Sequence, residues 1–345
     1  MLISKLLALL VSDLAANCAT LTQSQKVFSM DLFKPVSSFV GIFIMMIVAT
    51  LWLRRQDIIN QKHLPIISKM IVDLVYPALI FSVVAQSDLH INYILSAMSI
   101  NAALLIVGLL MGLLGKYVFR FNNASLMAFI LAGTFSGTSL IGSALLKVVY
   151  QDQPAIISMG VVIAQFSHGL LINTVGIFIG IHYCSFGEKI PFSRQVKQFL
   201  ISKPMLALTI GLAWNLLQFP TTGYLPITLF GGLTMIGSAL PFLSAMATGL
   251  AFESFKMRGM FWILLSVAFA QLLVEPTISH KLTEILDLPL LDRQVGLLLS
   301  ALPASPLAVV ICARYGGNTS LASAMVLFTR FISIISLPIT ALFSG

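Results

Sequence analysis

The sequence predicts an all-α polytopic membrane protein with ten transmembrane helices in two inverted five-helix repeats. Of its 345 residues, 58% are hydrophobic and only 9% are charged, and the mean hydropathy is +0.98. A soluble domain carries about 25% charged residues, so this composition indicates a membrane protein. From Phe33 onward the chain falls into ten apolar runs, each near the roughly 20 residues that a helix needs to cross a bilayer. The runs are residues 36–53, 64–86, 92–118, 124–148, 155–182, 204–219, 225–251, 259–279, 294–314 and 319–343.

Lysines and arginines are concentrated on one side of these predicted spans. Thirteen lie in alternate connections, namely Arg54, Arg55, Lys62, Lys69, Lys116, Arg120, Lys189, Arg194, Lys197, Lys203, Lys256, Arg258 and Arg314. The other connections hold three, Lys147, Lys281 and Arg293. The positive-inside rule makes the first side cytoplasmic and places both termini outside. The net charge of +8 does not indicate nucleic-acid binding, because the charges lie between apolar runs.

The organisation of the chain follows from its longest connection. We expect an N-terminal segment (1–34), a first repeat (35–183), a cytoplasmic connection (184–203) and a second repeat (204–345). The N-terminal segment reads equally well as a signal peptide or as a short interfacial helix. Since each repeat has an odd number of spans, the second must enter the membrane in the opposite sense. Pro77 and Pro241 hold corresponding places in the two halves.

The ninth run carries the sequence Leu302-Pro-Ala-Ser-Pro306 near its middle. Two prolines three residues apart cannot sit in one regular helix, so we expect two half-helices. Unsatisfied peptide groups cost several kcal/mol each in hydrocarbon, and a broken span is therefore tolerated only inside protein or beside a wet cavity. Interrupted helices of this kind form the binding sites of many secondary transporters, although a kinked span without a solute fits the same pattern.

The fourth run, the expected partner of the ninth, has no proline. It is rich in glycine and hydroxyl residues from Gly133 to Ser143. Such residues loosen a helix or let another backbone approach closely. Ordinary helix packing explains any one of them, but the cluster favours a break near Gly137–Gly142.

At these residues the chain resembles the auxin efflux carrier family, in its bacterial branch. The matching blocks are DLVYPALIFSVVA (73–85), FSGTSLIGSALL (135–146), SKPMLALTIGLAWNLL (202–217), GSALPFLSAMATGLAF (237–252) and LPASPLAVVICARYGGNTSLASAMVLFTRFISIISLP (302–338). The resemblance implies a secondary carrier related to bile acid symporters, with interrupted helices 4 and 9 that cross and small organic anions as substrates. The family usually has an asparagine and a proline where this chain has Gly137 and Ala144.

Three charges lie well inside the runs. Asp73, Glu275 and Arg330 would each cost ~2.5 to 3.5 kcal/mol or more if they faced lipid, so each should have a partner. Arg330 is either a docking group for an anion or half of an ion pair with Glu275 or Asp73. Glu275 is either a proton carrier or a solvated residue near the outer end of its span. The spacing of Asp73 and Lys69 favours an intrahelical pair.

Further polar residues lie in spans 3, 5 and 6. His168 could titrate near neutral pH, although a packing role is favoured. Asn101 and Asn215 are interpreted as interhelical hydrogen-bonding residues. Neither an enzyme signature nor a metal-binding pattern is present, so we expect no catalytic activity and no cofactor.

The sequence thus favours a secondary active carrier of a small organic anion, either coupled to a proton or sodium gradient or facilitative. The expected substrate-binding residues are Gly137, Thr138, Ser139, Ala304, Ser305, Pro306 and Arg330, and the expected ion-coupling residues are Glu275, His168 and Asp73. A carrier-like sensor or scaffold that binds a lipid or metabolite without net transport is the alternative. The expected setting is the bacterial inner membrane, with membrane lipid as a partner and a homodimer compatible with the chain.

Overall fold

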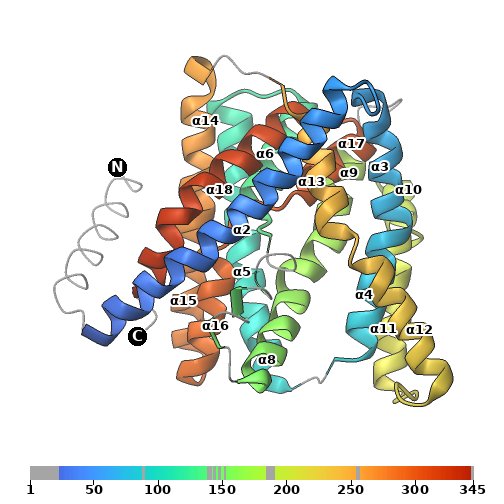
Figure 1. Cartoon of the computed structure of the whole chain (residues 1–345), viewed down its shortest axis with the longest axis vertical. Coiled ribbons are helices and arrows are strands. Elements are labelled where there is room, and N and C mark those ends of the chain that lie inside the picture. Colours follow the sequence, from blue (N-terminus) through green and yellow to red (C-terminus); the bar gives the residue numbers. More distant parts are fainter. Residues whose placement is uncertain are drawn as a thin grey trace.

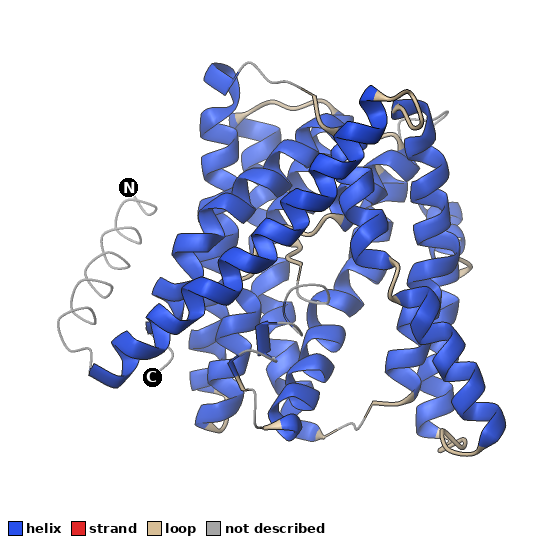
Figure 2. Cartoon of the chain, in the orientation of Figure 1, coloured by secondary structure: helices blue, strands red, loops and turns tan. Residues whose placement is uncertain are grey.

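The computed structural model describes residues 23–87, 90–137, 142, 145–146, 149–150, 153–183, 191–253 and 257–342. Within these ranges the secondary structure is helical, apart from an antiparallel bridge between Ser136 and Ala304 (Figure 2). The predicted all-α class is confirmed for this part of the chain.

The first half of the chain forms α2 (Gln23–Arg55), η1 (Gln61–His63), α3 (Leu64–Met70), η2 (Ile71–Val75), α4 (Tyr76–Ala85), α5 (Ile91–Leu113), η3 (Leu114–Val118), α6 (Asn123–Thr134), α8 (Pro154–Ala164), η5 (Gln165–Gly169), η6 (Ile172–Gly176) and α9 (Ile177–His182). The second half forms α10 (Phe192–Leu200), α11 (Lys203–Leu216), α12 (Tyr224–Gly237), α13 (Leu240–Ala251), α14 (Met257–Phe269), η7 (Ala270–Val274), α15 (Glu275–Ile285), α16 (Leu290–Ser300), α17 (Leu307–Tyr315) and α18 (Thr319–Leu342). The segment η1 is a 3-10 turn, and the other η segments are π-helical turns inside longer helices.

In the described part of the chain, seven helices are long and apolar enough to cross a membrane, and an eighth span is formed if α10 and α11, which meet at a 54° bend, count as one. These spans overlap eight of the ten predicted runs. Among the described residues, the other two runs (124–148 and 294–314) hold shorter helices: α6 in the first, and α16 and α17 in the second. A polytopic helical membrane protein is therefore confirmed, while the number ten stays a prediction.

Two of the predicted segment boundaries fall inside helices, and the division of the chain into segments stays a prediction. The first is the end of the N-terminal segment at residue 34, because α2 begins at Gln23 and runs through that position without a break. Residues 1–22 lie outside the described residues, and the signal-peptide and interfacial-helix interpretations stay predictions. The second is the cytoplasmic connection, which contains α10 and leads into α11.

The helices pack into two groups (Figure 1). Helices α4, α11 and α12 lie side by side at the right of the view, while α14, α15 and α16 lie at the left. Helix α2 crosses in front and packs along α18 and α13. The carboxyl-terminal ends of α6 and α16 and the amino-terminal end of α17 meet between the groups, where the most deeply buried side chains gather.

The outer surface is apolar, as expected of helices that face lipid. Large side chains such as Met235 and Trp262 are 79% and 70% exposed. Large exposed apolar side chains that gather on a soluble monomer would mark an interaction surface. In a bilayer, hydrocarbon solvates them.

Candidate functional site

The two interrupted segments cross at the centre of the molecule and are hydrogen-bonded to each other. Helix α6 ends at Thr134, and the chain continues in an extended conformation from Phe135. Between α16 and α17, residues 301–306 run without a regular helix. The Gly137 N–H donates to the carbonyl of Pro303 at 2.8 Å, and the Ser305 N–H donates to the carbonyl of Phe135 at 2.8 Å. The predicted break in the ninth run is therefore confirmed, and the fourth run breaks beside it.

This pairing explains why both helices can stop inside the membrane. A peptide group left unpaired in hydrocarbon costs several kcal/mol, and the crossing pairs groups from both segments. A third brace comes from α18, because the Ala304 N–H donates to Thr329 Oγ1 at 3.2 Å. Thr329 in turn donates to the carbonyl of Met325 at 2.9 Å. No local pattern in the sequence distinguishes Thr329, because it carries no charge and resembles any other threonine in a helix.

The start of α17 is also capped within the chain. The Leu307 N–H donates to Ser305 Oγ at 3.3 Å, and the Ala308 N–H donates to the Ser305 carbonyl at 3.1 Å. Ala304 and Ser305 are 0% and 2% exposed, and Pro306 is buried. The N–H groups of Ala304 and Ser305, and those of Leu307 and Ala308 after Pro306, therefore have partners inside the protein. The role of Ala304–Pro306 in substrate binding stays a prediction.

Two hydroxyls at the crossing have no partner among the described residues. Thr134 Oγ1 and Ser136 Oγ are buried and make no hydrogen bond. They belong to the glycine- and hydroxyl-rich stretch that the sequence indicated. Two predicted site residues in that stretch, Thr138 and Ser139, lie outside the described residues.

Arg330 is buried without a counter-charge in the described part of the chain. Its guanidinium carbon lies 3.7 Å from the centroid of the Phe43 ring, a cation–π contact between α18 and α2. Its Nε and Nη2 atoms have no hydrogen-bond partner there. The alternative that Arg330 pairs with Glu275 or Asp73 is wrong, because those carboxylates pair with other residues.

Glu275 instead meets His168. Glu275 Oε1 lies 2.8 Å from His168 Nε2, and both side chains are buried. The structure therefore corrects the interpretation of Glu275 as a solvated residue. The other oxygen, Glu275 Oε2, and His168 Nδ1 have no partner among the described residues, and the same holds for both amide atoms of Gln271 one turn away.

The local sequence explains the helix geometry at Glu275 and His168. A proline cannot donate to the carbonyl one turn earlier, and Pro276 follows directly after Glu275. The π-helical turn η7 ends at Val274, so it lies where Pro276 interrupts the regular backbone hydrogen bonds of the helix. His168 likewise lies in a π-helical turn, η5. Such turns re-aim side chains and are frequent at functional sites.

The pair is connected to the crossing through the fifth predicted span. A methyl group placed on Gly176 would lie 3.4 Å from the Phe135 ring, so this span passes directly beside the crossing. From Gly176 to His168 is eight residues, or about 12 Å along a helix.

Asp73 has a structural partner that differs from the expected one. Its carboxylate lies 3.4 Å from Lys203 Nζ, at the start of α11, while Lys69 makes no ion pair in the described chain. The Lys203 side chain is 58% exposed, so this is a surface pair. It joins α11 to the helix that contains η2.

The two asparagines act as predicted. The Asn101 amide donates to the carbonyl of Phe166 at 3.0 Å and so joins α5 to η5. Asn215 donates to carbonyls at the end of α4, the shortest of these bonds being 2.7 Å to Ser87. Within the described residues, no three histidine, cysteine or acidic side chains gather in a way that could hold a metal ion.

A cavity of about 620 Å³ lies between α4, α8 and α12, at the helix ends predicted to face outside. Its polar lining consists of Ser82, Gln86, Ser87, His90, Tyr93, Ser158 and Thr234. The cavity therefore offers hydroxyl and amide groups to a polar solute between the two helix groups.

Comparison with known proteins agrees with the motifs in the sequence. A family model described as a membrane transport protein matches residues 35–186, which include the first crossing segment and His168. A curated relative, an uncharacterized transporter of Methanocaldococcus jannaschii, is 21% identical over 285 residues, covering 81% of this chain and 89% of the relative. These similarities support a membrane transporter, and they agree with the resemblance of the sequence to the auxin efflux carrier family.

Proposed function

We propose that the protein is a secondary active carrier that moves a small organic anion across the membrane together with a proton. The observation that carries the proposal is the crossing of two interrupted segments in the membrane interior. Secondary carriers bind solutes where helices are broken, because such breaks bring polar backbone and side-chain groups to the bilayer midplane.

The architecture proposed for this carrier has ten spans. Seven continuous helices, the bent pair of α10 and α11, and the two interrupted segments make up that number. The packing also supports an inverted repeat. Helix α2 packs on α13 in the way that α11 packs on α4, and α5 packs on α6 as α15 packs on α16. These are the pairs that a two-fold relation between the halves would produce.

The solute is proposed to bind beside the crossing, at Gly137, Thr138, Ser139 and Ala304–Pro306. Three features favour an anion there. The hydroxyls of Thr134 and Ser136 are buried, have no partner among the described residues and can donate hydrogen bonds. The amino-terminal end of α17 carries the positive end of its helix dipole. Arg330, next to Thr329 in α18, supplies a positive charge that has no carboxylate partner within the described residues.

The proton is proposed to bind at the His168–Glu275 pair. A net charge in a buried site is unfavourable, so the pair is most stable when its total charge is zero. When the total charge of the His168–Glu275 pair is zero, the pair holds one proton more than it does as a carboxylate beside a neutral imidazole, where its total charge is −1. Closing this site to water therefore favours proton uptake, and opening it to a less acidic side favours release. Asp73 is proposed to contribute to coupling through its pair with Lys203 at the junction with α11.

Transport by reconstituted protein tests the proposal. Liposomes loaded with unlabelled monocarboxylates, dicarboxylates or an aromatic carboxylate should take up the same labelled compound by counterflow. Acid outside should accelerate net uptake. Counterflow with no compound in such a panel would instead favour a sensor or scaffold that binds without transport.

The crossing itself is tested by a matched pair of serine variants. Ser305 caps α17 from within the break, whereas Ser300 is also buried and donates to the carbonyl of Leu297 in its own helix. Ser305→Ala should lose most counterflow, and Ser300→Ala should retain it. Equal counterflow in both variants would remove the crossing from the proposed site.

A further inference from the structure

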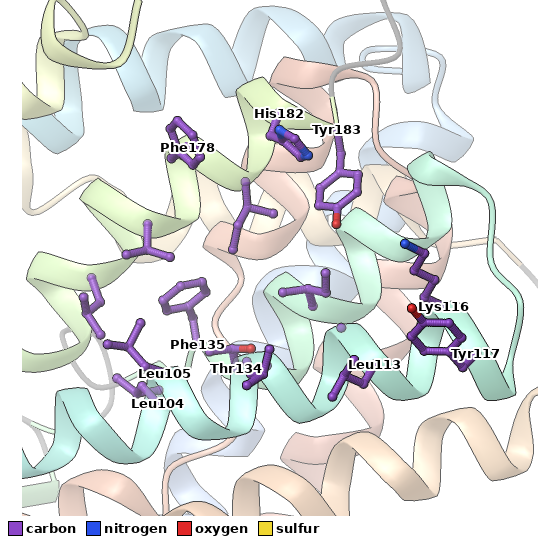
Figure 3. A pocket seen from close by; sticks show the side chains of 17 residues that line it. Leu104, Leu105, Leu113, Lys116, Tyr117, Thr134, Phe135, Phe178, His182 and Tyr183 are labelled. Atoms are coloured by element: carbon purple, nitrogen blue, oxygen red, sulfur yellow. The ribbon is translucent and has the colours of Figure 1, made fainter. Parts of the chain in front are cut away.

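A groove of about 470 Å³ borders the proposed solute site and lies between α5 and the fifth predicted span (Figure 3). Its floor is formed by Thr134 and Phe135 at the end of α6. One end is apolar and includes Leu104 and Leu105. The other end gathers the polar lining residues, which are Lys116, Tyr117, His182 and Tyr183.

Two glycines hollow the groove. Gly108 and Gly112 are four residues apart and so lie on the same face of α5. A methyl group on Gly112 would meet only Ile130, at 3.7 Å, and one on Gly108 would lie 3.2 Å from Thr134. Larger side chains at these positions would fill the space.

The rim of the groove belongs to the lipid-facing surface. Leu105, Leu109 and Leu113 line it and are 52%, 66% and 46% exposed. A surface of exposed leucines is stable in hydrocarbon and unfavourable in water. The groove therefore opens sideways towards lipid.

The polar end lies on the side that the basic connections make cytoplasmic. Lys116 Nζ lies 5.6 Å from the centroid of the Tyr117 ring and makes no ion pair with a carboxylate of the described residues. An anion at this end would meet a free ammonium group.

Helix α10 extends the same positively charged surface. It is held against the groove wall, because Gln195 hydrogen-bonds His182 at 3.2 Å and Phe192 contacts Phe178. Its exposed residues combine apolar groups with the cations Arg194 and Lys197. This composition is typical of a helix that lies at the interface with anionic lipid.

The length of the groove fits one leaflet. From Leu104 to Lys116 is twelve residues, which span about 18 Å in a helix. Half of a hydrocarbon core of about 30 Å is about 15 Å. An acyl chain that lay along the groove would therefore place its headgroup near Lys116.

We propose that this groove binds an anionic phospholipid of the cytoplasmic leaflet, with one acyl chain against Gly108 and Gly112 and the phosphate at Lys116. The leucine rim selects a lipid over a soluble anion, and the single cationic end selects an anionic over a zwitterionic headgroup. The inference depends on the orientation of the chain in the membrane and is independent of which solute is carried.

Native mass spectrometry of the full-length protein in detergent tests this inference. Phosphatidylglycerol should bind more tightly than phosphatidylcholine by about fivefold, the size of effect that one basic residue has near an anionic lipid surface. Lysophosphatidylglycerol should bind as well, since one acyl chain occupies the groove. Inorganic phosphate alone should not bind, and binding of phosphate with the affinity of the lipid would overturn the lipid assignment.

Variants with matched controls separate the two ends of the groove. Lys116→Gln should abolish the preference for phosphatidylglycerol, whereas Lys69→Gln, at another exposed cytoplasmic lysine, should keep it. Gly112→Leu should weaken binding of both lipids, whereas Gly231→Leu should not, because Gly231 has open space around it on α12. Size-exclusion profiles check folding of each variant. An unchanged preference in Lys116→Gln would refute the proposal even if Gly112→Leu failed to fold.

Discussion

Replacing Thr329 by valine removes the brace between α18 and the crossing without changing side-chain volume. In the native protein the Ala304 N–H donates to Thr329 Oγ1 at 3.2 Å, and both residues are 0% exposed. Valine cannot accept this bond, and no water reaches a fully buried peptide group. An unsatisfied buried donor costs about 1 to 3 kcal/mol, and we expect Thr329→Val to lower the free energy of unfolding by that amount.

Thr329→Ser is the matched control. Serine retains the hydroxyl and loses one methyl group, whose burial contributes about 0.8 kcal/mol. Denaturant unfolding of both variants in mixed micelles, followed by circular dichroism, compares the two free energies. Counterflow should fall in the valine variant and persist in the serine variant. If valine were as stable as threonine while serine were the weaker variant, packing and not the hydrogen bond would hold α18 to the crossing.

The remaining predictions concern charged groups. Glu275→Gln keeps an acceptor for His168 and should change the unfolding free energy by less than about 1 kcal/mol, while uptake loses its acceleration by external acid, measured as initial rate against outside pH. Retained acceleration would exclude Glu275 as the proton site. Arg330→Met removes a buried charge that meets no carboxylate in the described part of the chain, so unfolding should show equal or greater stability while uptake of the anion is lost; unimpaired uptake would make Arg330 purely structural. Asp73→Asn breaks a surface pair and should cost about 0 to 1 kcal/mol of stability, and a loss of several kcal/mol would contradict the exposed geometry seen for Lys203.

The break in the ninth predicted span could be predicted because proline acts locally. Pro303 and Pro306 exclude a continuous helix whatever surrounds them. The break in the fourth span was predicted near Gly137–Gly142, but α6 already ends at Thr134. Its end is set by the partner strand, since Phe135 and Gly137 must be extended to bond with Ser305 and Pro303. A contact across the molecule decides this position, and no local pattern encodes it.

The partners of Glu275 and Asp73 could not be predicted from the neighbouring sequence either. His168 and Glu275 are 107 residues apart in the chain, and each had a plausible solitary role. For Asp73 the spacing to Lys69 favoured a helix-face pair, but the packing of α11 brings Lys203 closer. Sequence spacing predicts neighbours within a helix, while the neighbours that matter inside a helical bundle come from other helices.

The antiparallel bridge at the centre also limits how the protein can change shape. Separating Phe135–Gly137 from Pro303–Ser305 would expose two donors and two acceptors to a medium with no water, at several kcal/mol for each group. Any motion that opens one side of the membrane and closes the other is therefore easier if these two segments travel together as one rigid body. The paired backbone segments would then form the fixed axis of the transport motion, and α4, α11 and α12 would move relative to it.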